Sequence, residues 1–415
     1  MQKISSCRIC GSTQLISFFD LGCHPFSNSL LPTKESPDYR FPLSLSRCSS
    51  CSLIQLNETA NPKELFSKYF WVTGTSKETK IWAEHFYNEA VSRMAHSENM
   101  FVMEIASNDG TFLEPFKNNG YKVQGIDPAG NIAEMAEKRG IPTFCEFFSS
   151  DYALKFIAEN SKADFIFVRN ALPHVANTLD FVKGLSVCMK DEGLLAIEFH
   201  YSKQILEGLQ YDSIYHEHLC YFSLYSISML FKKFNLFIQD VIPSPLCGGS
   251  LVVFFRKIPI ISTQSVTNLL KIEKELGVNA LERWEKFAKQ ATLHREEFRK
   301  VLTDIKSSGA IIAGYGASAR SSTLLNFCQV NKNLISCIAD QNSLKHNHLT
   351  AGTHIPIVSP EEMLTKKPSC VVILAWNFYQ EIVRNLRDIY KFKGKIIVPL
   401  PDSPRFISEE EIDKI

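Results

Sequence analysis

Long stretches of a single charge are absent from this sequence. Its 45 basic and 44 acidic residues leave a net charge of +1 at pH 7, and no extended basic run stands out. A protein that binds nucleic acid usually carries a basic face, because contacts to phosphate supply much of the affinity. We therefore expect a small-molecule ligand and no nucleic-acid partner.

Apolar runs of membrane-spanning length are also missing. A helix needs about 20 apolar residues to cross a bilayer, and the segment MQKISSCRICGS lacks the basic-then-apolar pattern of a signal peptide. The sequence thus predicts a cytoplasmic protein with no membrane partner. Thiols stay reduced in that compartment, so we expect the 12 cysteines to be metal ligands or core residues and not disulfides.

Four of these cysteines form two close pairs, Cys7-x-x-Cys10 and Cys48-x-x-Cys51. Each pair can place two thiolates on one turn, and two such turns complete a tetrahedral zinc site. The surrounding segment is polar and short of core-forming runs, so a metal would supply stability that packing cannot. Four unrelated buried cysteines are the simpler alternative, but the equal spacing favours zinc. Four thiolates leave no open position for water, so the metal is expected to be structural.

Apolar runs alternate with helical segments from residue 101 onward. Buried strands are expected at 101–106, 121–127, 142–148, 164–170 and 193–200. This alternation predicts a parallel α/β sheet with helices on both faces. Segments 236–242 and 251–257 are expected to add antiparallel strands at its edge. Residues 63–95 resemble a helical lead-in with a break near Gly74.

A charged helical connector at 263–306, with a break expected at Gly277, leads to a second α/β pattern. Its expected strands are 310–316, 334–340, 370–376 and 395–400. The predicted fold class is therefore α/β in three parts. These are a small N-terminal zinc-binding module (1–62), a central Rossmann-like domain with its helical lead-in (63–257), and the connector with a second, C-terminal Rossmann-like domain (258–415).

The turn after the first central strand, Glu104-Ile-Ala-Ser-Asn-Asp-Gly110, opens a helix, and its small residues let a ligand approach the backbone. Asp127, which ends the second strand, is suited to bridging two ribose hydroxyls. Acidic groups such as Glu104 and Asp109 favour a cationic ligand, and S-adenosylmethionine (SAM) carries a sulfonium and an ammonium. Many strand–helix turns look similar, and it is Asp127 that favours SAM. The predicted SAM site comprises Glu104, Ser107, Asn108, Asp109, Gly110, Asp127 and Asn170.

Ionisable side chains gather in Tyr215-His216-Glu217-His218, just after the fifth predicted strand. Adjacent residues rarely supply two ligands to one metal, so we favour a base with orienting partners. Glu217 would hold His218, and Tyr215 would donate to a developing enolate oxygen. His174, in the loop after the fourth strand, is expected to approach the same site. A lone loop histidine is otherwise more often a hydrogen-bonded surface residue.

The second α/β unit contains Gly314-x-Gly316-x-x-Ala319, and Asp340 ends its next strand. This spacing matches a dinucleotide fingerprint and would imply NAD and an oxidoreductase. Arg320 follows the glycines and would instead pair with the phosphates of a nucleotide sugar. Rossmann-like scaffolds are reused for many ligands, so the fingerprint alone leaves both interpretations open.

Four sequence segments together resemble the sugar C-methyltransferases that make 3-C-methylated deoxysugars. They are CRIC…CSSC, EIASNDGTFL, YHEHLCYF and GYGASARSSTLLNF, and the resemblance covers nearly the whole chain. It implies a SAM-dependent enzyme with structural zinc that methylates C3 of a nucleoside-diphosphate 4-keto-6-deoxysugar. His218 would remove the C3 proton, and His174, in NALPHVANTLDF, matches a histidine of the family's loop.

The resemblance also implies a sugar pocket. The segment KYFWVTGTS corresponds to a family stretch that supplies an aromatic hydroxyl, with Trp71 where a second tyrosine is expected. Cys247 and Val252 replace a histidine and an arginine that the family commonly has, which puts the usual substrate contacts in doubt. The predicted substrate-binding residues are Tyr69, Tyr221, Gly249, Ser250, Gly314, Gly316 and Arg320.

Three other functions compete with this prediction. The glycine fingerprint would suit an NAD-dependent oxidoreductase or epimerase, which copurified NAD would reveal. A binding protein without catalysis is a second alternative, against which the intact Tyr215, Glu217 and His218 argue. The third is a zinc-ribbon RNA methyltransferase, which the near-neutral charge disfavours.

Overall fold

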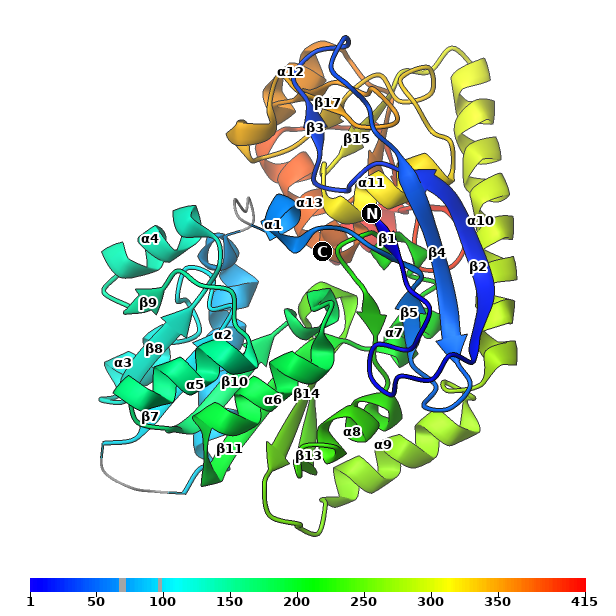
Figure 1. Ribbon diagram of the computed structural model, residues 1–415. Helices are drawn as coiled ribbons and strands as arrows, with labels where there is room; N and C mark the ends of the chain where they lie inside the picture. Colours follow the sequence, from blue (N-terminus) through cyan, green and yellow to red (C-terminus); the bar gives the residue numbers. More distant parts are fainter. Residues whose placement is uncertain (67–71, 96–98) are drawn as a thin grey trace.

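Two α/β units and a small N-terminal module pack against one another in the computed structural model (Figure 1), which describes residues 1–66, 72–95 and 99–415. The predicted three-part α/β fold is confirmed. The exact boundaries at 62 and 257 stay predictions. Across the described ranges, no helix is both long and apolar enough to traverse a lipid bilayer.

A seven-stranded sheet forms the centre of the first α/β unit, in the order β13-β14-β11-β10-β7-β8-β9. The strands are β7 (Phe101–Ile105), β8 (Lys122–Ile126), β9 (Thr143–Phe144), β10 (Ala163–Arg169), β11 (Met189–His200), β13 (Phe237–Ser244) and β14 (Ser250–Arg256). Neighbouring strands from β9 to β11 are parallel, so their carboxyl ends share one edge of the sheet.

The two strands at one edge of the sheet pair as predicted. β14 is antiparallel to β11, as expected for 251–257. β13 is antiparallel to β14, as expected for 236–242, and therefore runs in the same direction as β11.

Alternating side chains divide the core between the two faces of this sheet. Phe165 and Phe167 point to the face covered by α2 (Lys77–Val91) and α3 (Glu114–Asn118). Ile166 and Val168 point to the opposite core, which includes residues of α5 and α6. This period of two is what a strand buried on both faces requires. The other helices of this unit are α4 (Gly130–Lys138), α5 (Ser150–Glu159), α6 (Thr178–Cys188), α7 (Ser202–Glu207) and α8 (Leu224–Lys232).

The N-terminal module completes its sheets with strands from both α/β units. Its strands β2 (Leu15–His24), β4 (Phe41–Cys48) and β5 (Ile54–Leu56) form an antiparallel sheet whose fourth strand is β12 (Cys220–Tyr221) of the central unit. β3 (Leu30–Leu31) pairs with β17 (Leu349–Thr350) of the C-terminal unit. The module thus joins the other two parts. Its remaining elements are β1 (Gln2–Lys3), β6 (Glu58–Thr59) and the short helix α1 (Pro62–Phe66).

The second α/β unit has a smaller sheet in the order β18-β16-β15-β19-β20-β21. Its strands are β15 (Ile312–Tyr315), β16 (Ile338–Ala339), β18 (Ile357–Val358), β19 (Cys370–Ile373), β20 (Lys395–Val398) and β21 (Arg405–Phe406). The connector has the predicted break at Gly277, between α9 (Gln264–Glu275) and α10 (Leu281–Ser307). The other helices here are α11 (Ala319–Phe327), α12 (Pro360–Thr365), α13 (Tyr379–Arg384) and α14 (Glu409–Ile412).

Candidate active site and zinc centre

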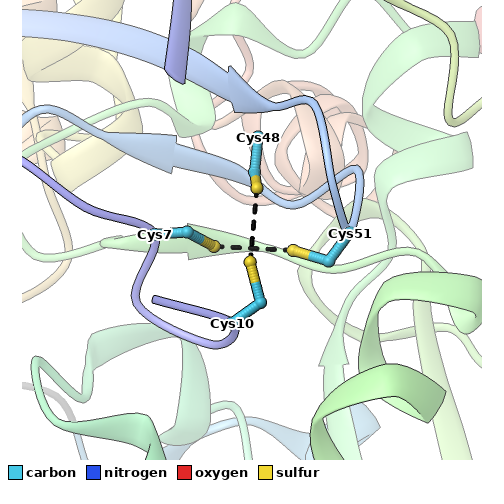
Figure 2. A group of neighbouring side chains, drawn as sticks. All are labelled: Cys7, Cys10, Cys48 and Cys51. Carbon is cyan, nitrogen blue, oxygen red and sulfur yellow. Dashed lines mark hydrogen bonds between the residues drawn. The ribbon is translucent and has the colours of Figure 1, made fainter. Parts of the chain in front are cut away.

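The four predicted metal ligands meet at one point. Figure 2 shows the sulfurs of Cys7, Cys10, Cys48 and Cys51 directed at a common centre, and all four lie within 4.8 Å of one another. The Sγ atoms of Cys7 and Cys51 are 3.5 Å apart, and those of Cys10 and Cys48 are 3.4 Å apart. A tetrahedral zinc with 2.3 Å bonds would require separations of roughly 3.8 Å, whereas a disulfide would require about 2 Å. The geometry fits zinc.

Two equivalent turns bring these thiols together. The amide of Gly11 donates to the carbonyl of Cys7, and the amide of Ser52 donates to the carbonyl of Cys48. Gly11 and Ser52 both adopt left-handed backbone angles, with φ of 76° and 61°. Each turn folds the chain back four residues after its first cysteine, so both thiols of a pair face the same side.

The predicted SAM turn lies at the carboxyl end of β7 and has an unusual backbone. Ala106 and Asn108 adopt φ of 57° and 49°, a region that costs a non-glycine residue about 1 kcal/mol or more. Asp127, directly after β8, stabilises this conformation, because its Oδ2 accepts from the amide of Asn108 and its Oδ1 accepts from the amide of Ala129. The remaining lone pairs of Asp127 can accept ribose hydroxyls.

Buried polar atoms at this turn fit a cationic ligand. Glu104 is fully buried, and its Oε1 accepts from Nε of Arg169 at 3.0 Å. Its Oε2 and the hydroxyl of Ser107 accept or donate no hydrogen bond within the described ranges. Burial raises the pKa of Glu104 to about 8, against the opposing effect of Arg169. A cation placed beside Glu104 would satisfy its free oxygen, which is what the ammonium or sulfonium of SAM offers.

Arg169 and Glu198 extend this charged cluster, and neither was among the predicted site residues. Glu198 is buried on β11, accepts from the hydroxyl of Ser244, and lies 3.9 Å from Arg169. One guanidinium therefore faces two buried carboxylates, Glu104 and Glu198. Arg169 ends β10 and directly precedes Asn170, which was predicted to bind SAM. A charged residue at the end of an otherwise apolar strand was the signal in the sequence that could have identified it.

Asn108 and Asp109 hold the helical lead-in. The side chain of Asn108 accepts from the amide of Thr73, and Asp109 accepts from the amide of Gly74. Asp109 also forms a 2.7 Å ion pair with Arg139. We expected Asp109 to favour the cationic end of SAM, but its charge is already paired and its contacts fix the loop. Gly110, at φ 76°, packs against Ile141 where a side chain would clash.

His218 has a defined tautomer. Its Nδ1 lies 2.8 Å from the carbonyl oxygen of Ser213, which can only accept, so Nδ1 carries the proton. Its Nε2 is then the acceptor for the hydroxyl of Tyr215, 2.8 Å away. Burial and the neighbouring histidines hold the pKa of His218 well below its usual range, so it is neutral at pH 7. A neutral imidazole with an unprotonated Nε2 can accept a proton, as a general base must.

Glu217 does not hold His218, contrary to our expectation. Its Oε1 accepts from the side-chain amide of Asn28 at 2.7 Å, and its pKa is raised to about 7 by burial. The hydrogen bonds of His218 go to Ser213 and Tyr215 instead. Adjacent residues point in different directions here, and the partner from the N-terminal module could not be inferred from local sequence.

His174 and the first residue of β14 complete the candidate site. The rings of His174 and His218 lie 4.8 Å apart, edge to face, and burial lowers the pKa of His174 to about 4. Ser250, at the start of β14, donates to the side chain of Asn170 at 3.5 Å. Predicted catalytic and cofactor residues therefore converge at the carboxyl edge of the central sheet. Tyr221 is buried in β12, and Gly249 has φ of 110° beside Gln204.

Tyr69 and the positions that depart from the family pattern give no direct support for a sugar pocket. Tyr69, with Trp71, lies outside the described residues. Val252, where the family commonly has arginine, is buried beside Glu198 in register. The carbonyl of Cys247, which stands in place of a histidine, accepts from Arg320.

The glycine fingerprint of the C-terminal unit is used internally. Side chains at Gly314 and Gly316 would clash with Leu374 and Ala375, so these glycines allow close packing. Arg320, predicted to bind phosphate, forms a bidentate ion pair with the buried carboxylate of Asp212, at 2.7 and 2.9 Å. Its charge is therefore largely neutralised within the protein.

Comparison with known proteins agrees with these observations. The sequence matches the zinc binding domain at residues 7–66, the methyltransferase domain at 80–241, and the C-methyltransferase C-terminal domain at 245–401. The C-methyltransferase NovU of Streptomyces niveus is 30% identical over 416 residues, which cover 99% of this chain and 98% of that protein.

Two solved methyltransferases show weaker similarity. A SAM-dependent methyltransferase from Clostridium acetobutylicum is 13% identical, with a TM-score of 0.34 over 44% of this chain and 93% of that one. Magnesium protoporphyrin IX methyltransferase from Synechocystis is 11% identical, with a TM-score of 0.34 over 43% and 80% of the two chains. At these TM-scores the likeness carries no weight for substrate or mechanism.

The fold, the four-thiolate centre and the matched domains define a SAM-dependent methyltransferase with a zinc-binding module. Its full-length match narrows this class. The chain belongs to the zinc-containing C-methyltransferase family. The predictions of SAM and structural zinc are confirmed, and the interpretation as an NAD-dependent oxidoreductase finds no support.

Proposed function

We propose that the protein methylates C3 of a nucleoside-diphosphate 4-keto-6-deoxysugar. The observation that carries this proposal is the neutral His218, held by Ser213, with its unprotonated Nε2 at the hydroxyl of Tyr215 and its ring against that of His174. A C-methyltransferase needs a carbon nucleophile, and a C4 ketone acidifies the C3 hydrogen so that a histidine can remove it. The substrate is a small molecule, in a protein that we expect to be cytoplasmic.

Tyr215 must change partners for His218 to act. In the described state its hydroxyl occupies Nε2 of His218. When the sugar binds, we propose that this hydroxyl turns to the C4 oxygen, which frees Nε2 to take the C3 proton. The same hydrogen bond then stabilises the negative charge that develops on that oxygen.

His174 would be the second donor to this oxygen. It is neutral at pH 7, because its pKa lies near 4, and a neutral imidazole can still donate one N–H. SAM, when bound, supplies an electrophilic methyl group. The proton passes to His218, the methyl group passes to C3, and neutral S-adenosylhomocysteine leaves, so charge and atoms balance.

The remaining substrate contacts belong to the same proposal. We assign them to Tyr69, Tyr221, Gly249, Ser250, Gly314, Gly316 and Arg320. Arg320 would contact phosphate only in addition to its ion pair with Asp212. We also keep the domain boundaries 1–62, 63–257 and 258–415 as part of this proposal.

Mass spectrometry with labelled SAM and a panel of nucleoside-diphosphate 4-keto-6-deoxysugars tests this function. We expect one carbon-bound methyl group on at least one sugar. His218→Asn should lower turnover by about 100-fold or more while SAM still binds, because a general base contributes that much. His85→Asn, on the exposed face of α2, is the matched control and should keep full activity.

Two results would count against the proposal. Transfer to no sugar of the panel, with SAM binding measured separately, would exclude this substrate class. Full turnover by His218→Asn would remove the histidine from the mechanism.

A further inference from the structure

We propose that the C-terminal unit sets the tautomer and orientation of His218 through the segment Tyr211–Ile214, which we call the strap. The strap immediately precedes the Tyr215–His218 cluster. Three of its four residues form hydrogen bonds with side chains from the connector or the C-terminal unit. Thr323 and Trp376 are then positioning residues for the reaction. The kinetic part of this inference rests on the proposed role of His218.

The first of these contacts is at Tyr211, which is fully buried. Its hydroxyl lies 2.8 Å from Nδ1 of His294 on α10 and 3.2 Å from the sulfur of Cys328. Nε2 of His294 lies 2.7 Å from the carbonyl of Pro399, so it must carry the ring proton. Nδ1 is then an acceptor, and Tyr211 donates to it. The connector and the C-terminal unit thus share one buried hydrogen-bond chain with the strap.

The second contact is at Asp212, whose side chain is fully buried. Arg320 of α11 donates to both carboxylate oxygens, and the indole N–H of Trp376 donates to Oδ2 at 2.7 Å. Arg320 also stacks over the ring of Trp376. Three donors from two elements of the C-terminal unit therefore fix one carboxylate.

The third contact is at the backbone of Ile214. The hydroxyl of Thr323, on α11, donates to the Ile214 carbonyl at 2.9 Å in a buried setting. α11 also packs directly on the turn Tyr211–Ser213. This contact holds the peptide between Ile214 and Tyr215, one residue after the carbonyl of Ser213.

The three contacts surround Ser213 in the sequence and so restrict the orientation of its carbonyl. That oxygen accepts from Nδ1 of His218. In the sequence, Ser213 is flanked by Asp212, whose side chain is fixed, and by Ile214, whose carbonyl is held by Thr323. If this peptide rotates, Nδ1 of His218 loses its acceptor, and the proton can move to Nε2. In the Nε2-protonated tautomer, Nε2 has no free lone pair. It could then not take the C3 proton after Tyr215 turns away.

Nitrogen-15 NMR of histidine-labelled protein tests the tautomer without any substrate. We compare the wild type with Thr323→Val and Trp376→Phe, and we assign the His218 signal by its loss in His218→Asn. The wild type should show a single tautomer protonated at Nδ1. Both variants should show a mixture, with the Nε2-protonated form clearly populated. Thr353→Val is the control, because its buried hydroxyl bonds to Thr350, away from the strap.

Proton exchange at C3 of the sugar in heavy water, in the presence of S-adenosylhomocysteine, isolates the base from methyl transfer. Both variants should slow this exchange and kcat by about tenfold, since misplacing a reacting group by less than 1 Å can cost that much. The KM for SAM should change by less than about twofold, because the described contacts of Thr323 and Trp376 with the strap do not involve the turn at 104–110. Thr353→Val should match the wild type in all three values.

The outcomes separate the two proposals. A wild-type tautomer and wild-type exchange in both strap variants would overturn the positioning role. A mixed tautomer in the variants, with no exchange or methylation by the wild type on any sugar, would keep the strap and reject the proposed function. Equal tautomer mixtures in the variants and in Thr353→Val would mean general loosening of the C-terminal unit and would also overturn the inference.

Discussion

Asp127 and Asp340 stand at the same place in the two α/β units, each directly after the second strand of its sheet. Asp127 accepts from the amide of Asn108, in the turn after β7, and from the amide two residues after itself. Asp340 accepts from the amide of Ala317, in the turn after β15, and again from the amide two residues on. The two aspartates therefore stabilise their turns in the same way.

The charge around the two turns differs. Lys345 donates to Asp340 at 3.1 Å and to the carbonyl of Ala317 at 2.8 Å, so the C-terminal turn carries its own cation. No lysine does this beside Asp127 within the described ranges. There, the carboxylate of Glu104 keeps one buried oxygen without a partner.

The glycine spacing of a Rossmann-like turn is therefore a poor guide to its ligand. The C-terminal turn has the better fingerprint, but Lys345 occupies the acid that a dinucleotide ribose would need. The central turn has Ala106 where a glycine would be easier, and its unbalanced acid suits a cation. The buried oxygen that remains without a hydrogen bond is the more informative feature.

Removal of zinc should have the largest effect and should separate the SAM turn from catalysis. Cys48→Ser should abolish zinc binding and unfold the N-terminal module, because four thiolates are needed to close the site. Activity should fall by about 100-fold or more, since Asn28 of the module holds Glu217 beside the proposed base. SAM affinity, measured by calorimetry, should fall by less than about threefold. Normal zinc content in this variant would contradict the four-thiolate site.

Exchanging each aspartate for asparagine compares the two turns directly. Asp127→Asn should weaken SAM binding by about 30- to 100-fold, because it loses the charge-assisted bonds that hold Asn108 and would accept the ribose. Asp340→Asn should change SAM affinity by less than about twofold. Equal losses in titration calorimetry would mean that the turns are not distinct in function.

The pH dependence of stability tests the unbalanced acid. The folded-state pKa of Glu104, about 8, lies above its value of about 4.3 in the unfolded chain. The folded protein therefore binds the extra proton between these values, and stability should decline as the pH rises from about 4.3 to 8. Glu104→Gln should lack this decline, a difference of about 5 kcal/mol by pH 8.

Urea unfolding of both proteins at several pH values measures this difference, and contributions from other groups cancel between them. Saturating SAM should reduce the decline in the wild type, because a bound cation favours the ionised carboxylate. Parallel pH profiles for the wild type and Glu104→Gln would show that Glu104 is not the unbalanced acid.

Loss of the lysine at the C-terminal turn should have the smallest effect. Lys345→Met should destabilise the protein by about 1 kcal/mol, because the partly buried Asp340 loses one charged partner but keeps two amides. SAM affinity should stay unchanged. A thermal melt with calorimetry checks both, and a loss of SAM binding would contradict the separation of the two turns.

The sequence predicted those parts of the fold that depend on local pattern. The cysteine pairs, the strands on either side of the SAM turn and the break at Gly277 all follow from spacing and periodicity. The antiparallel edge strands β13 and β14 were predicted as well.

The missed contacts of the site are those between residues far apart in sequence. The bond from Asn28 to Glu217 spans most of the first two domains, and the role of Glu198 depends on the neighbouring strand that carries Arg169. Glu217 was misassigned because chain proximity to His218 was taken as spatial proximity. Tertiary placement, which no local signal specifies, decides the partner of a buried charge.

The borrowed strands of the N-terminal module also govern the order in which the chain can fold. During synthesis, β2, β4 and β5 leave the ribosome well before β12, so their sheet lacks an edge strand until residues 220–221 emerge. β3 waits still longer for its partner β17. An unpaired sheet edge invites wrong pairing with other chains. Early zinc binding would hold the two cysteine turns together through this interval, which makes the metal a folding clamp for the nascent chain.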